Sequence, residues 1–240
     1  IMEKRYEKNL SAFSEEEINR LHYLKICIVG CGGLGGYIAE EMARAGIGMI
    51  TLIDGDVFDE SNLNRQIVCN EKNIGKKKAS ETKKRIEQIN SEIQIKAIDE
   101  AADEKNCKEV FRDCQVVFDA VDNIPARILI EKKAEEAGVP LVHGAVNGWY
   151  GQVCVIYPGD RIIEKIFSDG AAETVNTKEG DRTGNEGAKA GAPAFTPAAV
   201  ASVQTAEGIK VLLKKESILR KKLLTMDLMD QEYESIKLDG

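Results

Sequence analysis

The sequence predicts an α/β fold, with a doubly wound, mostly parallel sheet whose C-terminal strands are antiparallel. Three observations predict it. Short apolar runs alternate with helical patterns over the first half of the chain, as in repeated strand–helix–strand units. A glycine-rich turn joins the first of these runs to the first long helical pattern. Near the C-terminus two apolar runs follow each other with no helix between them, which favours antiparallel pairing.

The elements of the first half follow from their apolar spacing and from the residues that start or stop them. Ser14 and Glu17 form the capping box of a short helix, and Pro125 and Gly138 bracket a longer one. Strands are expected at residues 25–30, 49–54, 93–98, 116–120 and 140–145. Helices are expected at residues 14–24, 33–45, 76–90, 103–112 and 125–137. Because such units have right-handed crossovers, this order predicts helices on both faces of the sheet.

The rest of the chain has a different pattern. A strand over residues 151–158 has no helix before it. The glycine-rich residues 159–194 lack periodicity, and we expect them to form a mobile crossover loop. A helix then begins with Thr196 as its N-cap and Pro197 in its first turn. Two closing strands are expected at residues 223–229 and 233–238.

Length and composition suit one large α/β domain. We divide the 240 residues into an N-terminal arm and helix, residues 1–24, and a single domain, residues 25–240. The net charge of −7 disfavours nucleic acid and anionic membranes as partners. No apolar run is long enough to span a bilayer. The six cysteines form no C-x-x-C pair and no export signal is visible, so we expect reduced thiols and a cytoplasmic location.

The first half also carries a nucleotide-binding motif. Gly30, Gly32 and Gly35 fit the pattern G-x-G-x-x-G between a strand and a helix, as in Rossmann-like folds. The glycines allow a tight turn, and the following helix offers free backbone N–H groups to a phosphate. Asp54 ends the second strand, where a carboxylate can accept hydrogen bonds from ribose hydroxyls. On these facts alone NAD is the expected ligand.

The charged residues that follow fit a dehydrogenase poorly. Arg65 lies just after the ribose-binding strand, Lys78 starts the next helix, and Asp122 follows the fourth strand. Ligands of such sheets bind at the carboxyl ends of the strands, so these side chains are expected to converge beside the glycine loop. Two cations and a carboxylate suit a triphosphate with a divalent metal. Alternatively, Arg65 forms a surface ion pair and Asp122 only caps the helix that Pro125 opens.

Five motifs together resemble one family. "GCGGLG", "LIDGD", "SNLNRQ", "GKKKA" and "DAVDN" occur here in the order and spacing of the ThiF/MoeB/HesA branch of the ubiquitin-activating superfamily. This resemblance implies an adenylyltransferase that uses ATP and Mg²⁺. Its implied substrate is the C-terminal carboxylate of a small ubiquitin-like sulfur carrier ending in Gly-Gly, in thiamine, molybdopterin or related sulfur metabolism. A homodimer is implied, and a sulfurtransferase is a possible further partner.

The resemblance also implies roles for individual residues. The phosphates would be surrounded by Gly30, Gly32, Gly33 and Gly35. Asp54 would hold the ribose, and Asp56 would shape the site. The phosphates and the reacting carboxylate would be contacted by Asn62, Arg65 and Gln66. Lys78 would bind phosphate and Asp122 would coordinate Mg²⁺, so the implied catalytic residues are Arg65, Lys78 and Asp122.

The chain departs from the family pattern in three places. The C-x-x-C pairs that hold a structural zinc in many relatives are missing, so we expect no zinc. Residues 159–194 contain no cysteine, which predicts that the product stays an acyl-adenylate. The N-terminal arm reads "RYEKN", with Lys8 where relatives carry arginine. In the family this flexible arm delivers a cation to the neighbouring subunit's ATP, a role that Arg5 and Lys8 would take here.

The sequence is also compatible with other functions. The substrate could instead be a small-molecule carboxylate or a tRNA base, and the rival enzyme class is an NAD- or FAD-dependent oxidoreductase. The rival without catalysis is a nucleotide-binding scaffold that pairs with an active subunit. His22 and His143 lie in no nucleophile motif and are expected to be packing or surface residues. Trp149 is expected in the core, with a position at the rim of the site as the alternative.

Overall fold

One mixed sheet forms the centre of the molecule. The computed structural model describes residues 3–168 and 191–238, and within them eight strands pair in the order β3-β2-β1-β4-β5-β6-β7-β8. The strands are β1 (Lys25–Val29), β2 (Met49–Ile53), β3 (Gln94–Ile98), β4 (Val116–Asp119), β5 (Leu141–Asn147), β6 (Tyr150–Ile156), β7 (Lys222–Asp227) and β8 (Glu232–Lys237). β1 to β5 pair in parallel, and β6 to β8 pair antiparallel with their neighbours. The predicted fold class is confirmed.

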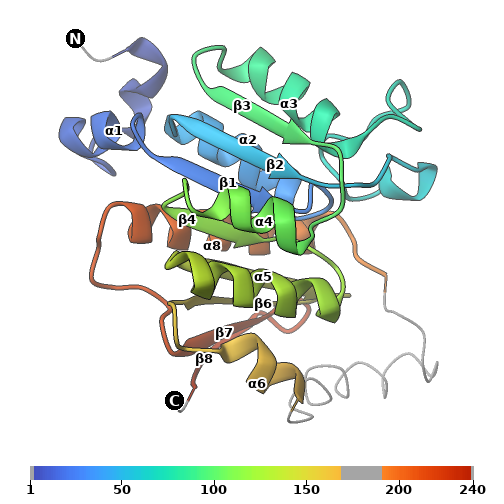
Figure 1. Cartoon of the computed structure of the whole chain (residues 1–240), viewed down its shortest axis with the longest axis vertical. Coiled ribbons are helices and arrows are strands. Elements are labelled where there is room, and N and C mark those ends of the chain that lie inside the picture. The colour runs from blue at the N-terminus through green and yellow to red at the C-terminus, as the bar shows by residue number, and fades with distance from the viewer. Residues whose placement is uncertain (1–2, 169–190, 239–240) are drawn as a thin grey trace.

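Helices cover both faces of the sheet (Figure 1). The core on one face includes side chains of α2 (Gly35–Ala45), α3 (Lys78–Ile89) and α8 (Phe195–Leu212). The core on the other face includes α4 (Glu104–Phe111), α5 (Ile124–Ala137) and α6 (Ile162–Ser168). The smaller elements are η1 (Lys4–Asn9), α1 (Glu15–Leu21) and η2 (Glu60–Asn62). Within the described residues, no helix is long and apolar enough to cross a membrane.

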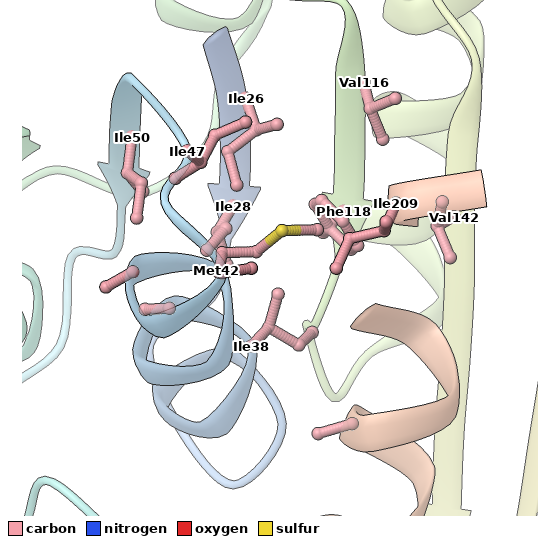
Figure 2. Close-up of a cluster of buried hydrophobic side chains, with 14 of the residues drawn as sticks. Ile26, Ile28, Ile38, Met42, Ile47, Ile50, Val116, Phe118, Val142 and Ile209 are labelled. Atoms are coloured by element: carbon pink, nitrogen blue, oxygen red, sulfur yellow. The ribbon is translucent and has the colours of Figure 1, made fainter. Parts of the chain in front are cut away.

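The core between α2, α8 and the sheet fixes where α8 packs. Figure 2 shows Met42 of α2 and Phe118 of β4 converging between the sheet and the helices. A Cβ atom at Gly208 of α8 would lie only 2.2 Å from the Phe118 ring, so glycine lets this helix pack closely on the sheet. Full burial of a side chain as large as Phe118 contributes about 1.5–3 kcal/mol. This packing brings the first turn of α8 to the carboxyl ends of the strands.

Two expectations for the second half of the chain are wrong. Residues 162–168 form α6, although we expected residues 159–194 to be a loop, and residues 169–190 lie outside the described residues. Thr196 does not cap α8, because its buried hydroxyl donates a hydrogen bond to the carbonyl of Gly148 (2.8 Å). The helix begins two residues earlier than expected, at Phe195, with Ala194 at the N-cap position. Pro197 does fall in the first turn, where the missing N–H costs nothing.

The N-terminal arm is anchored to its own chain, although we expected a flexible arm. Tyr6 is buried, and its hydroxyl accepts a hydrogen bond from the Asn90 amide (2.7 Å). Arg5 donates to the Asn90 side-chain oxygen (2.6 Å) and forms an ion pair with Glu92 (3.7 Å). Asn90 follows the last residue of α3, so the arm docks where β1 to β3 begin (Figure 1).

Candidate active site

A cavity lies at the carboxyl ends of the central strands. Its volume is about 590 Å³, which is within the usual range for a small-molecule site. The walls are the glycine loop after β1, the ends of β2 and β4, the start of α3, the β5–β6 hairpin and the first turn of α8. The cavity therefore lies where doubly wound sheets bind their ligands.

The four glycines of the loop have two different functions. Gly30 has φ +93°, and a Cβ atom there would lie 2.5 Å from the carbonyl oxygen of Ala120. A Cβ atom at Gly35 would lie 1.8 Å from the carbonyl oxygen of Gly30. These two glycines form the turn. Gly30 also lines the cavity, together with Gly32 and Gly33, which have no backbone contacts of that kind. The backbone of the loop is thus exposed to a ligand at Gly32 and Gly33.

Asp54 connects the glycine loop to the end of β2. Its half-buried carboxylate accepts backbone hydrogen bonds from Cys31 (2.6 Å) and Asp56 (2.8 Å). Each carboxylate oxygen accepts more than one hydrogen bond, so Asp54 can still receive hydroxyl donors from the cavity that it lines. The ribose role of Asp54 stays a prediction, and its structural role is to shape the loop.

Lys78 provides a nearly buried cation at the cavity wall. Only 10% of its side chain is exposed, and its Nζ atom lies 3.1 Å from the Asp56 carboxylate. The Asp56 side chain is 75% exposed, so water screens this ion pair strongly. Lys77 differs, because its exposed side chain donates to the carbonyl of Gly55 (2.6 Å) and does not line the cavity.

Arg65 and Gln66 line the cavity on the turn that follows η2. The Arg65 guanidinium donates to the Ser61 carbonyl (3.1 Å) and to the Asn64 side-chain oxygen (2.9 Å), both neutral. Among the described residues Arg65 forms no ion pair. The buried Oε1 atom of Gln66 has no hydrogen-bond partner among the described residues. Buried polar atoms of this kind are rare, so a bound ligand with a donor group fits there.

Asn62 lies outside the cavity, although we expected it to contact the phosphates. Its side-chain oxygen accepts a hydrogen bond from the Asp59 backbone (3.1 Å), which completes the capping box of η2. Its backbone carbonyl accepts from the N–H groups of Arg65 and Gln66. Asn62 therefore holds the turn that carries these two residues.

Asp122 is exposed and lines the cavity beyond the end of β4. Its alternative role as a helix cap is wrong, because the Asn123 side chain accepts the capping hydrogen bond from Ala126 (2.9 Å). The Asp122 carboxylate is only weakly engaged, by the Asn123 amide at 3.4 Å. Its carboxylate oxygens can therefore accept further ligands from the cavity, as a metal-binding residue must.

A buried polar network, which was not expected from the sequence, lies at one wall of the cavity. His143 is fully buried, and its Nδ1 atom lies 2.6 Å from the Asp119 carboxylate. Its Nε2 atom lies 3.1 Å from the Gln152 amide nitrogen and 3.5 Å from Arg127. Gln152 and Arg127 line the cavity. The available signal was a polar residue within each of three largely apolar strands, which a purely structural strand does not need.

Cys31 and Cys69 lie near the cavity, and neither has a lowered thiol pKa. Burial raises the pKa of Cys31 well above its ordinary value, and the Asp54 carboxylate raises it further. Burial also raises the pKa of Cys69, although Lys78 opposes this shift. Since the thiolate is the nucleophile, both side chains are poor nucleophiles near neutral pH.

Trp149 is not a core residue. It is 37% exposed at the β5–β6 turn, and its ring centroid lies 4.5 Å from that of Phe195. The adjacent residue Tyr150 lines the cavity, so Trp149 lies near its rim.

The zinc content of the protein tests whether this chain lacks the ligands of a structural zinc. Within residues 3–168 and 191–238, no three or more His, Cys, Asp or Glu side chains cluster as a metal site. We expect the purified protein to contain no zinc, because a tetrahedral site needs four ligands. Elemental analysis measures this directly, and about one zinc per chain would contradict the expectation.

Known proteins place this architecture in one family. The chain matches the ThiF family over residues 6–240. It is 31% identical over 217 residues to the SAMP-activating enzyme E1 of Haloferax volcanii, which covers 90% of this chain and 77% of that protein. It is 30% identical over 227 residues to the sulfur carrier protein adenylyltransferase of Thermus thermophilus, which covers 90% of this chain and 79% of that protein.

A solved structure agrees in fold. The crystal structure of E. coli MccB with ATP has a TM-score of 0.81 and 23% identity, over 99% of this chain and 72% of that chain. The sequence relatives confirm the predicted enzyme class, an adenylyltransferase. By the extent of its match, the chain belongs to the ThiF family.

Proposed function

We propose that this protein uses ATP and Mg²⁺ to adenylate the C-terminal carboxylate of a small ubiquitin-like sulfur carrier that ends in Gly-Gly. The observation that supports this most is that Arg65, Lys78 and Asp122 border the same cavity as the glycine loop. The names of the relatives, a SAMP-activating enzyme and a sulfur carrier protein adenylyltransferase, support a carrier protein as the substrate.

The proposed step joins two anions. A carboxylate oxygen of the carrier attacks the α-phosphorus of ATP and forms the mixed anhydride bond of an acyl-adenylate. The bond from the α-phosphorus to the bridging oxygen breaks, and pyrophosphate leaves with that electron pair. Lys78 and Arg65 offset the repulsion between the reactants, and the N–H groups before α2 add fixed dipoles directed at the phosphates.

The residues present fit Mg²⁺ bound with the nucleotide. Mg²⁺ usually keeps several waters and binds through one or two carboxylates together with substrate phosphates. Asp122 is exposed at the cavity and only weakly engaged, and Asp56 offers a second exposed carboxylate in the lining. When bound, the ion would neutralise phosphate charge, and Asp122 is the residue that we propose holds it.

Nucleotide choice tests the proposal. We expect ATP with Mg²⁺ to bind and NAD not to bind, because hydride transfer has no use for two cations beside the phosphates. Isothermal titration calorimetry with each nucleotide measures this. Tight binding of NAD without binding of ATP would reject the proposed function.

We further propose that the enzyme is a cytoplasmic homodimer that passes its acyl-adenylate to a sulfurtransferase. All six cysteines are unpaired, which suits a reducing compartment. Arg5 docks beyond the last turn of α3, whereas Lys78 in the first turn borders the cavity. A helix of 12 residues is about 18 Å long, so Arg5 and its own cavity lie at opposite ends of α3. A cation from the arm would therefore act on the neighbour's ATP.

Subunit mixing tests the action of the arm in trans. A chain with Arg5→Ala and Lys8→Ala is expected to lose most ATP–pyrophosphate exchange activity. It lacks the cations of the arm, which we propose stabilise charge during transfer. Mixing it with an Asp122→Ala chain should restore part of the activity, since one site of the heterodimer is then intact. Mass spectrometry of tagged chains verifies the exchange of subunits. No recovery in verified heterodimers would mean that the arm acts in cis or not at all.

A further inference from the structure

The buried network of Asp119, His143 and Gln152 is not explained by the residue roles above. Asp119 and His143 are fully buried, and Gln152 is 5% exposed at the cavity wall. Asp119 and His143 are paired neighbours on β4 and β5, and Gln152 lies on the adjacent strand β6. A buried polar chain of this kind is costly unless each group is satisfied, so it fixes side-chain orientation strongly.

The hydrogen bonds determine how the Gln152 carboxamide is oriented. The Asp119 carboxylate accepts from His143 Nδ1, so that nitrogen carries the proton. Burial lowers the pKa of His143, which favours the neutral ring with Nε2 as an acceptor. Gln152 must then donate through its NH₂ group to His143 Nε2 (3.1 Å). Its carboxamide oxygen is left as the acceptor that this residue can offer to the cavity.

Gln152 lies on β6 and therefore borders the half of the cavity that is far from Asp54. Asp54 follows β2, whereas Gln152 lies on β6, four strand positions away in the order β2-β1-β4-β5-β6. Strands lie about 4.8 Å apart, so the separation across the sheet is roughly 19 Å. A nucleotide held at Asp54 and the glycine loop occupies the β2 side. Gln152 therefore faces the half that is left for the acyl substrate.

We propose that the carboxamide oxygen of Gln152 accepts a hydrogen bond from the last peptide N–H of the acyl substrate, and that His143 and Asp119 are positioning residues that hold it. The inference rests on the proposed function and narrows its substrate class. A peptide C-terminus has an N–H next to the reacting carboxylate, and a simple organic acid does not. A neutral carboxamide also avoids the repulsion that a carboxylate at this position would cause.

The test uses two stable mimics of the acyl-adenylate. In one, N-acetyl-glycylglycine is joined to adenosine 5′-sulfamate, and in the other the final glycine is replaced by glycolic acid, so that an ester oxygen replaces the N–H. Calorimetry measures the affinity of each mimic, and of adenosine 5′-sulfamate alone, for the full chain. We expect the wild type to bind the amide about tenfold more tightly than the ester, the effect of one hydrogen bond in a desolvated site.

Variants test whether Gln152 is the residue that accepts the hydrogen bond from the last peptide N–H. Gln152→Leu should bind the amide about tenfold more weakly and the two mimics equally, with unchanged affinity for adenosine 5′-sulfamate. Gln88→Leu makes the same chemical change at an exposed position on α3 and should behave as wild type. His143→Phe should reduce the amide-to-ester ratio without changing affinity for adenosine 5′-sulfamate. If His143→Phe does not fold, Gln152→Leu decides.

The outcomes separate this inference from the proposed function. Equal binding of amide and ester by the wild type, or an undiminished preference in Gln152→Leu, would overturn the inference while leaving adenylation in place. If neither mimic binds more tightly than adenosine 5′-sulfamate, the acyl half of the site is absent. That result would reject the proposed function together with the inference.

Discussion

Replacing Lys78 by methionine is expected to reduce ATP–pyrophosphate exchange on the order of 100-fold or more, because a positioned charge that stabilises the transition state is lost. Methionine keeps most of the aliphatic stem, which matters because only 10% of the Lys78 side chain is exposed. The assay contains ATP, labelled pyrophosphate and the cognate carrier. Circular dichroism of the variant shows whether the fold is kept.

The neighbouring lysine provides a matched control. Lys77→Met makes the same chemical change one residue earlier, where the side chain is exposed and outside the cavity lining. It should keep nearly full exchange activity. Arg65→Ala and Asp122→Ala are expected to lose activity as Lys78→Met does, and Cys69→Ser to retain it, since adenylation needs no thiol. Equal activities of Lys77→Met and Lys78→Met, or loss of exchange only in Cys69→Ser, would contradict the assigned chemistry.

The first half of the fold was predictable because its signals are local. The capping box of Ser14 and Glu17 is present, and Gly46 and Gly138 end their helices in the left-handed conformation. Helix α6 was missed although Ile162, Ile163 and Ile166 supply an apolar face. A helix of seven residues is not stable alone, and α6 depends on packing against α5. Contacts with distant residues cannot be seen in a local pattern.

In the candidate site, too, the features with local sequence signals were predictable. We could predict the positions of Arg65, Lys78 and Asp122 at the cavity, because each follows a strand or starts a helix beside the glycine loop. Strand topology brings such positions together. The capping hydrogen bond of Asn62 was not foreseen, because the choice between a ligand contact and a capping hydrogen bond depends on how its turn is oriented. The network of His143 and Gln152 needs the register of β4, β5 and β6, which no local signal supplies.

Substituting alanine for Gly35 is expected to destabilise the protein by roughly 3 kcal/mol, the upper part of the usual range for overpacking. The added Cβ atom would lie 1.8 Å from the carbonyl oxygen of Gly30, which is backbone and has no alternative rotamer. The loop cannot move away easily. The Gly30 N–H donates to the carbonyl of Ile53 (2.8 Å), and Gly30 already lies against Ala120 of the neighbouring strand end.

Gly33→Ala provides the comparison that makes this result specific. A Cβ atom at Gly33 would lie 3.5 Å from Pro197, which is an ordinary contact, so this variant should stay within about 1 kcal/mol of wild-type stability. Because Gly33 lines the cavity, the Gly33→Ala variant should nevertheless bind ATP·Mg²⁺ more weakly than the wild type does. Urea denaturation measures the free energy of unfolding, and calorimetry measures the binding. If Gly35→Ala were as stable as Gly33→Ala, the loop would be far more adaptable than its backbone contacts indicate, and the assignment of Gly35 to the turn and of Gly33 to the ligand-facing part of the loop would fail.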